Sequence, residues 1–330
     1  MQHILAVDIG GTKIAVGIAE RSVFAERGTL ARIVTERVPA PGTPAAVVPR
    51  VIAIARELLG ALSDPDPLLS GIGIAIGGPL DHRAGVVINF PHLPEWKNVP
   101  LRAMLSEALG APALLDNDAN LGALGEHAWG AGRGVEDMVY MTISTGIGGG
   151  VIVGGRLLHG VGSAAGEVGH ITVQTGGPRC PCGNAGCLEM MASGTAIARR
   201  ARQAVAESPD AGARILQQAG GEALGIRAEG VWAAALEGDG LAIRLWEETA
   251  EYLAIGLAAI VHVLAPRVMV LGGGVAQTDE RFLEAVRSRM RDHVGYVPLE
   301  RISVVRSALG SNSPLIGAAV LGLEAAGDQH

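Results

Sequence analysis

One histidine and three cysteines have a spacing that suits a metal ion. They follow the pattern H-x9-C-x-C-x4-C, and the members are His170, Cys180, Cys182 and Cys187. One imidazole and three thiolates complete the tetrahedral ligand set of structural Zn²⁺ sites, with no position left for a catalytic water. The competing interpretation is three unrelated buried cysteines and a surface histidine. Because all 3 cysteines of the chain are crowded into this one stretch, the spacing predicts a structural zinc site.

Two glutamates flank this cluster. Glu167 precedes His170, and Glu189 follows Cys187. A metal ion that holds both ends of the loop would also fix these carboxylates, which could then accept hydrogen bonds from several sugar hydroxyl groups. The alternative is that both glutamates are simply solvated. Other histidines have no assignable partner and are expected to be surface or satisfied core residues: His3, His82, His127, His159, His262, His293 and His330.

Glycine-rich bends form a second group of candidates. The first bend reads DIGGTK and contains Asp8, Gly10, Gly11, Thr12 and Lys13. Its backbone N–H groups can surround phosphate oxygens, its threonine adds a hydroxyl group and its lysine adds a cation. Its aspartate could hold Mg²⁺ through water. The GxxxxGK spacing of a Walker loop is absent, and an ordinary glycine hairpin is the competing interpretation.

Two further glycine clusters strengthen the phosphate-binding interpretation. The second bend covers residues 144–149 and contains Thr145 and Gly146. Two such bends can hold one polyphosphate chain from both sides. A third cluster at residues 272–274 follows a strand-like run, and Gly273 and Gly274 could let an adenine ring lie against the backbone. Close packing of a helix on a sheet is the alternative there.

Asp116, Asn117 and Asp118 follow a short strand-like run. Ligands of α/β folds bind at the carboxyl ends of strands, where an aspartate can accept or orient a hydroxyl proton during phosphoryl transfer. Asn117 offers a donor and an acceptor to sugar hydroxyls. Taken alone, the pattern favours a simpler interpretation, in which Asp116 or Asp118 is the N-cap of the next helix.

The elements that position these residues alternate between strands and helices. Apolar β-branched runs predict strands at residues 4–7, 14–18, 71–76, 113–115, 138–143, 150–153 and 268–271. Helical spacing of apolar residues predicts helices at 45–62, 101–109, 119–130, 243–264 and 315–323, with 207–230 the least readable segment. This alternation indicates an α/β fold. The similarity of the first two bends suggests a weak internal repeat, and therefore two similar α/β lobes.

Composition excludes several classes of protein. A chain of 330 residues with 48% hydrophobic residues can fill two cores, so disorder is excluded. The net charge of −7 and the scarcity of aromatic residues, at 3%, argue against a nucleic-acid partner. No apolar run reaches the length of a membrane span, and no signal peptide is recognisable. We therefore expect a cytoplasmic protein without membrane or nucleic-acid partners.

The motifs together resemble the ROK family of sugar kinases, a branch of the actin-like, hexokinase-like ATPase fold. The resemblance rests on DIGGTK at 8–13, GIGIAIGGPLD at 71–81, LLDNDANLGALGE at 114–126, STGIGGGVIVGGRLLHG at 144–160, GEVGH at 166–170, CPCGNAGCLE at 180–189 and VLGGGV at 270–275. It spans nearly the whole chain, and the pair GEVGH and CPCGNAGCLE is its most specific part. It implies an N-terminal lobe of residues 1–118, joined by a C-terminal helix at 311–330, and a second lobe of residues 119–310 with the zinc loop.

The resemblance also implies an activity and its residues. The family binds ATP between two lobes, with the glycine bends on its phosphates and Mg²⁺ near Asp8. The family's catalytic base corresponds to Asp118. Its sugar contacts correspond to Gly78, Asn117, Glu167, His170 and Glu189, and its zinc ligands to His170, Cys180, Cys182 and Cys187. His170 would then bind zinc through one ring nitrogen and donate to a sugar hydroxyl through the other.

One segment departs from the family pattern and concerns the sugar. Glucokinase-like members usually carry an asparagine in a segment resembling PNLPGW, whereas residues 91–96 read PHLPEW. Either His92 replaces that asparagine or Asn89 supplies the amide. Glucose, giving glucose 6-phosphate, is the expected substrate. The alternatives within the family are N-acetylmannosamine, N-acetylglucosamine and fructose.

Two functions of other classes are alternatives to the kinase. Sugar-responsive repressors of this family carry a winged helix before the kinase-like part, and the first glycine bend begins too early here to leave room for one. A zinc-containing sugar-binding module without catalysis is disfavoured because Asp118 occurs together with two phosphate-binding bends. The family resemblance further implies a homodimer or homotetramer.

Overall fold

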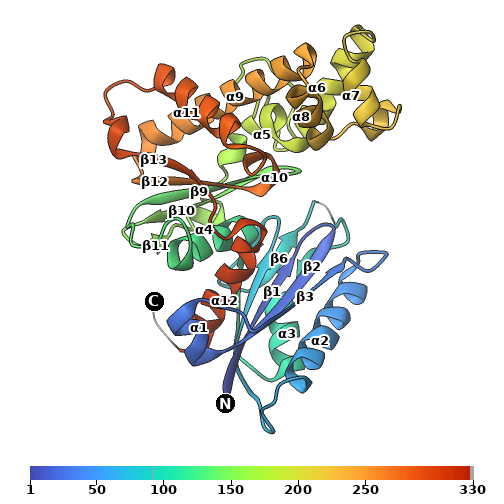
Figure 1. Ribbon diagram of the computed structural model, residues 1–330. Helices are drawn as coiled ribbons and strands as arrows, with labels where there is room; N and C mark the ends of the chain where they lie inside the picture. The colour runs from blue at the N-terminus through green and yellow to red at the C-terminus, as the bar shows by residue number, and fades with distance from the viewer. Residues whose placement is uncertain (92, 328–330) are drawn as a thin grey trace. The chain divides into compact units, whose positions relative to one another are not determined.

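The computed structural model describes residues 1–91 and 93–327 (Figure 1). Its contacts divide the chain into two units, and each is described by itself. The first unit comprises Met1–Glu136, Gly150–Gly166 and the segment from Ser311 onward. The second comprises Asp137–Gly149 and Glu167–Gly310.

A five-stranded sheet forms the centre of the first unit. Its order is β3 (Arg32–Arg37), β2 (Lys13–Glu20), β1 (Gln2–Ile9), β4 (Leu68–Ile76) and β8 (Ala113–Asn117). The first glycine bend joins β1 to β2 as an antiparallel hairpin, as expected, and β4 and β8 run parallel to β1. Asp8 lies opposite Ala75, and Ala75 lies opposite Asp116. The parallel register therefore brings candidate residues from separate motifs to one edge of the sheet.

Helices cover both faces of this sheet (Figure 1). They are α1 (Arg21–Arg27), α2 (Pro44–Gly60), α3 (Leu101–Leu109), α4 (Asp118–Trp129) and α12 (Ser313–Ala325). The apolar residues of α2 and α3 form one core with β1, β2 and β4, and α12 packs on the other face together with α4. A small sheet of β5 (Leu80–Asp81), β6 (Val86–Asn89) and β7 (Lys97–Val99) completes the unit.

Glycines allow α12 to approach its neighbours closely. A Cβ atom on Gly317 would lie 1.8 Å from the carbonyl oxygen of Leu121 in α4. A Cβ atom on Gly73 would lie 1.7 Å from the carbonyl oxygen of Ala318. Because this contact ties α4 to α12, residues 119–136 belong to the first unit, whereas the sequence suggested that the second lobe begins at residue 119.

The strand order of the second sheet repeats that of the first. It runs β11 (Arg156–Leu157), β10 (Ile147–Val153), β9 (Met138–Ile143), β12 (Val268–Gly272) and β13 (Ser303–Arg306). Here too a glycine bend joins two strands, and two further strands run parallel to the first of them. Strand β10 begins at Ile147, so the second bend is shorter than the expected 144–149.

The remaining helices lie mainly in the second unit. They are α5 (Leu188–Ala192), α6 (Gly194–Glu207), α7 (Ala213–Gln218), α8 (Ala228–Leu236), α9 (Gly240–Leu264), α10 (Gly273–Ala276) and α11 (Glu280–His293). Short 3₁₀ helices cover η1 (Val161–Ser163), η2 (Val168–His170), η3 (Ala223–Gly225), η4 (Leu299–Arg301) and η5 (Gly310–Asn312). Within residues 1–91 and 93–327, every helix is too short or too polar to cross a membrane.

The contact of α12 with α4 gives a stability prediction. Gly317→Ala would force a methyl group into the backbone of α4, so we expect the free energy of unfolding to fall by about 1–3 kcal/mol. Gly60→Ala is the control, because a Cβ atom there meets nothing within 4 Å, and we expect a neutral or slightly stabilising effect. Chemical denaturation of both variants measures the difference, and equal stabilities would contradict the close approach.

Candidate active site

The junction between β8 and α4 holds the central candidate residues. Asn117 is the N-cap of α4, because its Oδ1 accepts hydrogen bonds from the N–H groups of Ala119 at 2.9 Å and Asn120 at 3.4 Å. The simpler interpretation, with Asp116 or Asp118 as the cap, is therefore wrong. Asp118 is the first residue of the helix, and its Oδ1 accepts the N–H of Ala119 at 2.8 Å. The helix N-terminus favours a charged carboxylate at this place.

Asp8 is a buried carboxyl group at the end of β1, with only 7% of its surface exposed. Burial, followed by the charge of Asp118, raises the pKa of Asp8 to about 7, and Lys13 opposes both effects. Neighbouring carboxyl groups can bind a cation together, and oxygen donors are the ligands that Mg²⁺ prefers. The residues present therefore fit a magnesium ion near Asp8.

The first bend presents its polar groups outward. The N–H of Gly10 donates to the carbonyl oxygen of Lys13 at 2.9 Å, which closes the bend. Gly11 is partly exposed, and Thr12 and Lys13 are exposed. They line a hollow of about 690 Å³ together with Arg37. This arrangement can hold an anionic group.

Gly78 lies next to the carboxyl end of β4 in a conformation that suits glycine. Its φ is +94°, and a Cβ atom there would lie 2.3 Å from the carbonyl oxygen of Asn89. At the preceding Gly77, a Cβ atom would lie 3.5 Å from Oδ2 of Asp118. The structure thus brings Gly78, exposed Asn89 and Asp118 into one neighbourhood of the first unit. His92, the other candidate for the missing amide, lies outside the described residues.

In the second unit, Glu189 connects the second glycine bend to the cysteine loop. Its Oε2 accepts the N–H of Ile147 at 2.8 Å, and a Cβ atom on Gly146 would lie 2.5 Å from the same oxygen. Glu189 follows Cys187, the N-cap of α5. Thr145 lies exposed at the tip of the bend. Glu189 is therefore held in place by backbone rather than simply solvated.

In the third glycine cluster, one glycine fits the packing interpretation and another fits the ligand interpretation. Gly273 has a φ of +82°, and a Cβ atom there would lie 2.3 Å from the carbonyl oxygen of Ile143 in β9. It is a packing glycine between strand and helix. Gly274 is exposed, and nothing lies within 4 Å of its Cβ position. Only Gly274 offers open backbone to a ligand.

The four predicted zinc ligands meet in the second unit. The Sγ atoms of Cys182 and Cys187 lie 3.7 Å apart, and Nδ1 of His170 lies 3.6 Å from Sγ of Cys180. All four ligand atoms lie within 4.8 Å of one another. With bonds of about 2.3 Å to sulfur and about 2.0 Å to nitrogen, a tetrahedral zinc site needs separations of about 3.5–3.8 Å. The cluster is compatible with structural zinc.

The pKa values of the three thiols also bear on the metal site. Burial, followed by the neighbouring thiols, raises the pKa of Cys187 to about 12. Burial also raises the pKa of Cys180, whereas the backbone N–H of Asn184 lowers that of Cys182. The two buried thiols, Cys180 and Cys187, therefore resist ionisation, and a bound metal ion would compensate the charge of their thiolates.

His170 presents its two ring nitrogens to different partners. Nδ1 is the atom near Cys180, while Nε2 lies 3.7 Å from Oε2 of exposed Glu167. The N–H of His170 donates to the carbonyl oxygen of Glu167 at 3.1 Å, which closes the 3₁₀ turn η2. The geometry is therefore compatible with the predicted double role of His170, with Nδ1 toward a metal ion and Nε2 toward a sugar hydroxyl.

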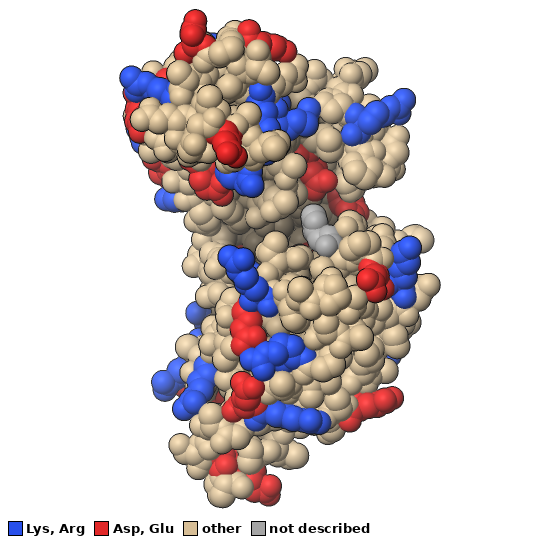
Figure 2. All heavy atoms as spheres, turned by 90° about the vertical axis from the view of Figure 1, so that its right-hand side faces the viewer, with Lys and Arg blue, Asp and Glu red and all other residues tan. Residues whose placement is uncertain are grey.

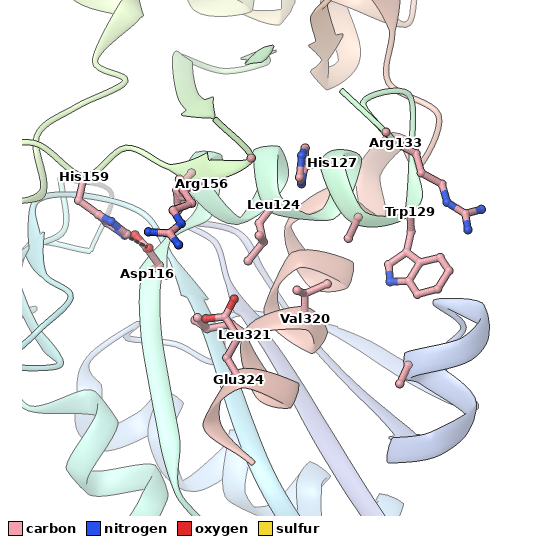
Figure 3. A pocket seen from close by; sticks show the side chains of 15 residues that line it. Asp116, Leu124, His127, Trp129, Arg133, Arg156, His159, Val320, Leu321 and Glu324 are labelled. Carbon is pink, nitrogen blue, oxygen red and sulfur yellow. Dashed lines mark hydrogen bonds and ion pairs between the residues drawn. The ribbon is translucent and has the colours of Figure 1, made fainter. Parts of the chain in front are cut away.

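Sequence reasoning missed one residue of the first unit. His159, expected to be a surface or satisfied core residue, places Nε2 2.6 Å from Oδ2 of Asp116. Figure 3 shows the two side chains pointing toward each other. His82, placed in the same class, stacks on His159. No sequence pattern links these residues, because His159 and Asp116 are separated by 43 positions.

Comparison with known proteins identifies the family. The model of the ROK family matches residues 4–325. The chain belongs to the ROK family. The glucokinase of Streptomyces coelicolor is 34% identical over 321 residues, which cover 97% of each chain.

Solved ROK structures share the fold. The ROK hexokinase of Thermus thermophilus is 34% identical, with a TM-score of 0.82 over 99% of this chain and 100% of that one. A ROK glucokinase of Streptomyces griseus, solved in complex with glucose and AMPPNP, is 33% identical, with a TM-score of 0.82 over 98% and 99% of the two chains. The expected actin-like, hexokinase-like fold with duplicated α/β domains is confirmed.

The raised pKa of Asp8 gives a prediction for the protein without Mg²⁺. The carboxyl group ionises near pH 4 when unfolded but only at about 7 when folded, so stability falls as the pH rises between these values. Asp8→Asn removes this effect. We expect the difference in melting temperature between the variant and the wild type to increase from about pH 4.5 to about pH 7.5, a range that spans this window. Exposed Asp210→Asn is the control, and a constant difference for Asp8→Asn would contradict the assignment.

Proposed function

We infer that the protein is an ATP-dependent glucose kinase, which transfers the γ-phosphoryl group of ATP to a glucose hydroxyl and forms glucose 6-phosphate and ADP. The observation that carries this inference is the match to glucokinases over the full length of both chains. The site chemistry agrees with it, because the first unit holds a carboxylate at a helix N-terminus beside a glycine-rich phosphate bend.

We propose Asp118 as the base that accepts the proton of the attacking hydroxyl. It is placed by a capped helix start and lies near Gly77 and Gly78. Asn117 would orient the sugar through its amide. Mg²⁺ held near Asp8 would neutralise charge on the phosphate oxygens. Gly10, Gly11, Thr12 and Lys13 of the first bend, with Thr145 and Gly146 of the second and Gly274, are the proposed phosphate and nucleotide contacts.

We propose that Glu167, His170 and Glu189 bind sugar hydroxyls. Their support is the metal-compatible cluster, which includes His170 and ends at Cys187, two residues before Glu189. A bound zinc ion would fix the ring of His170 through Nδ1 and leave Nε2 as a donor. Asn89, exposed beside Gly78, is the proposed amide contact that would discriminate glucose from N-acetylated hexosamines.

The setting of the protein follows from its chemistry. Thiolate ligands need a reducing compartment, so we propose a cytoplasmic location. Basic and acidic side chains are interspersed on the face seen in Figure 2, and the net charge is −7, so we propose no nucleic-acid partner. A homodimer or homotetramer remains a prediction from family membership.

The function is tested by a coupled ADP-release assay. We expect glucose to give a higher kcat/KM than N-acetylmannosamine, N-acetylglucosamine, mannose or fructose. Asp118→Asn keeps the shape of the side chain but removes the base, so we expect kcat to fall by about 10²–10⁴-fold while glucose binding survives.

The control for this variant is Asp66→Asn, an exposed carboxylate of the first unit, which should leave kcat unchanged. Normal turnover by Asp118→Asn would show that another group accepts the proton. A preference for an N-acetylated hexosamine would overturn glucose as the substrate but not the kinase.

Metal removal gives a separate prediction. Cys182→Ser removes one ligand of the proposed zinc ion, and we expect loss of the bound metal together with a larger rise in KM for glucose than for ATP, since Glu189 and His170 depend on this loop. Arg179→Ala, an exposed change in the same loop, is the control. Metal content and initial rates measure both effects, and a Cys182→Ser protein that retains zinc and activity would refute the role.

A further inference from the structure

A hydrogen-bonded pair, His159 and Asp116, lies at the β8–α4 junction, two residues before the candidate base. Nε2 of His159 lies 2.6 Å from Oδ2 of Asp116, and the side chain of Asp116 is only 4% exposed against 28% for His159. Since a carboxylate accepts hydrogen bonds only, the imidazole must donate from Nε2. A buried carboxylate needs such donors to remain charged.

Asp116 also accepts hydrogen bonds from residues at the start of α4. Its Oδ1 accepts the backbone N–H of Asn117 at 2.7 Å and the side-chain amide of Asn120 at 2.9 Å. Asn117 in turn caps the helix. One carboxylate therefore connects the end of β8, the cap and the first turn of α4, which contains Asp118.

His159 is itself held in place from its ring face. The ring of His82 stacks on it with centroids 3.8 Å apart and an interplanar angle of 11°. His82 Nδ1 lies 2.7 Å from Oγ of Ser163. Burial, followed by the charge of His159, lowers the pKa of His82, so the stack favours a neutral His82.

The pair forms part of the wall of a cavity of about 540 Å³ in the first unit (Figure 3). Glu324 extends toward it from α12 (Figure 3), and burial followed by the charge of Asp116 raises the pKa of Glu324. The titratable and charged groups around the pair come from the segment around β5, from α4 and the turn that follows it, from β11 and from α12: Asp81, His82, Arg83, His127, Arg133, Arg156 and Glu324.

We propose that His159 is a positioning residue for phosphoryl transfer, which orients Asp118 by holding Asp116 at the junction of β8 and α4. The proposal rests on the role of Asp118 proposed above. His159 itself contacts Asp116 through the hydrogen bond from Nε2 and acts on the reaction through that carboxylate.

Loss of His159 is expected to affect the position of Asp118 rather than the stability of the fold. When His159 is lost, Asp116 loses one of three donors while it stays near the charge of Glu324. The carboxylate is then free to rotate, which disturbs its hydrogen bond to the backbone N–H of Asn117. A displacement of a catalytic group by about 1 Å can cost about 100-fold in rate, although water entering from the cavity would replace part of the lost contact.

Three substitutions of His159 separate the lost donor from the lost ring. The amide nitrogen of glutamine can reach the position of Nε2, whereas that of asparagine is too short. We therefore expect kcat to fall by about tenfold to 100-fold in His159→Ala and His159→Asn, with His159→Gln restoring most of it. The KM for ATP should not change.

Rescue by the conservative variant gives a readout that a merely structural role would not move. A general loss of folding in His159→Ala would weaken glucose binding together with kcat, whereas the positioning role predicts a loss of kcat at unchanged KM for ATP and its restoration in His159→Gln. Asp116→Asn combined with His159→Ala should be no slower than Asp116→Asn alone, because both changes break the same contact.

His127→Ala is the matched control. His127 lines the same cavity, but its Nε2 contacts the carbonyl oxygen of Val135 at 2.9 Å and not Asp116. Equal losses in His127→Ala and His159→Ala, or independent effects of the Asp116 and His159 changes, would overturn the proposal. Thermal melting and glucose binding of each variant establish that it is folded.

The outcome is distinguishable from failure of the proposed base. Normal turnover by Asp118→Asn would refute the base whatever His159 does. A slow Asp118→Asn together with normal kcat in His159→Ala would refute the positioning role alone.

Discussion

The cap at the start of α4 is the interaction on which the candidate active site depends. Asn117 closes the helix by accepting backbone N–H groups, and this fixes Asp118 in the first turn. A helix start at the carboxyl end of a parallel strand combines two favourable conditions, because N–H groups point outward and the adjacent strands bring Asp8 to the same edge. The close glycine contacts between α4 and α12 then keep this helix from shifting along the sheet.

In the second unit, a metal ion rather than a helix cap would position the candidate residues. Its candidate residues lie on a 3₁₀ turn and a five-residue helix, whose apolar residues Val168, Leu188 and Met191 are buried. The loop between them brings together four side chains that could hold a metal ion, and Glu189 accepts a hydrogen bond from the backbone N–H of Ile147. A cation bound there would fix the loop, because it would compensate the charge of the crowded thiolates.

Duplication explains why much of the fold is readable from local patterns. Both sheets consist of a hairpin with a glycine bend followed by two parallel strands, and buried parallel strands are continuous apolar runs. The expected helix at 101–109 and strand at 138–143 match α3 and β9. The extent of the first unit was harder to predict, because it is decided by the packing of α4 on α12, a contact between segments far apart in sequence.

The sequence by itself identified the cluster of one histidine and three cysteines, the two glycine-rich bends and the polar triplet 116–118, because the pattern of each lies within a short stretch of the chain. Only the tertiary structure decided which residue of the triplet caps the helix, that Gly273 packs while Gly274 stays open, and that His159 pairs with Asp116. The reason is physical: hydrogen bonds and ion pairs depend on distances of a few ångströms, and residues separated by 43 positions acquire such distances only when strands and helices have packed.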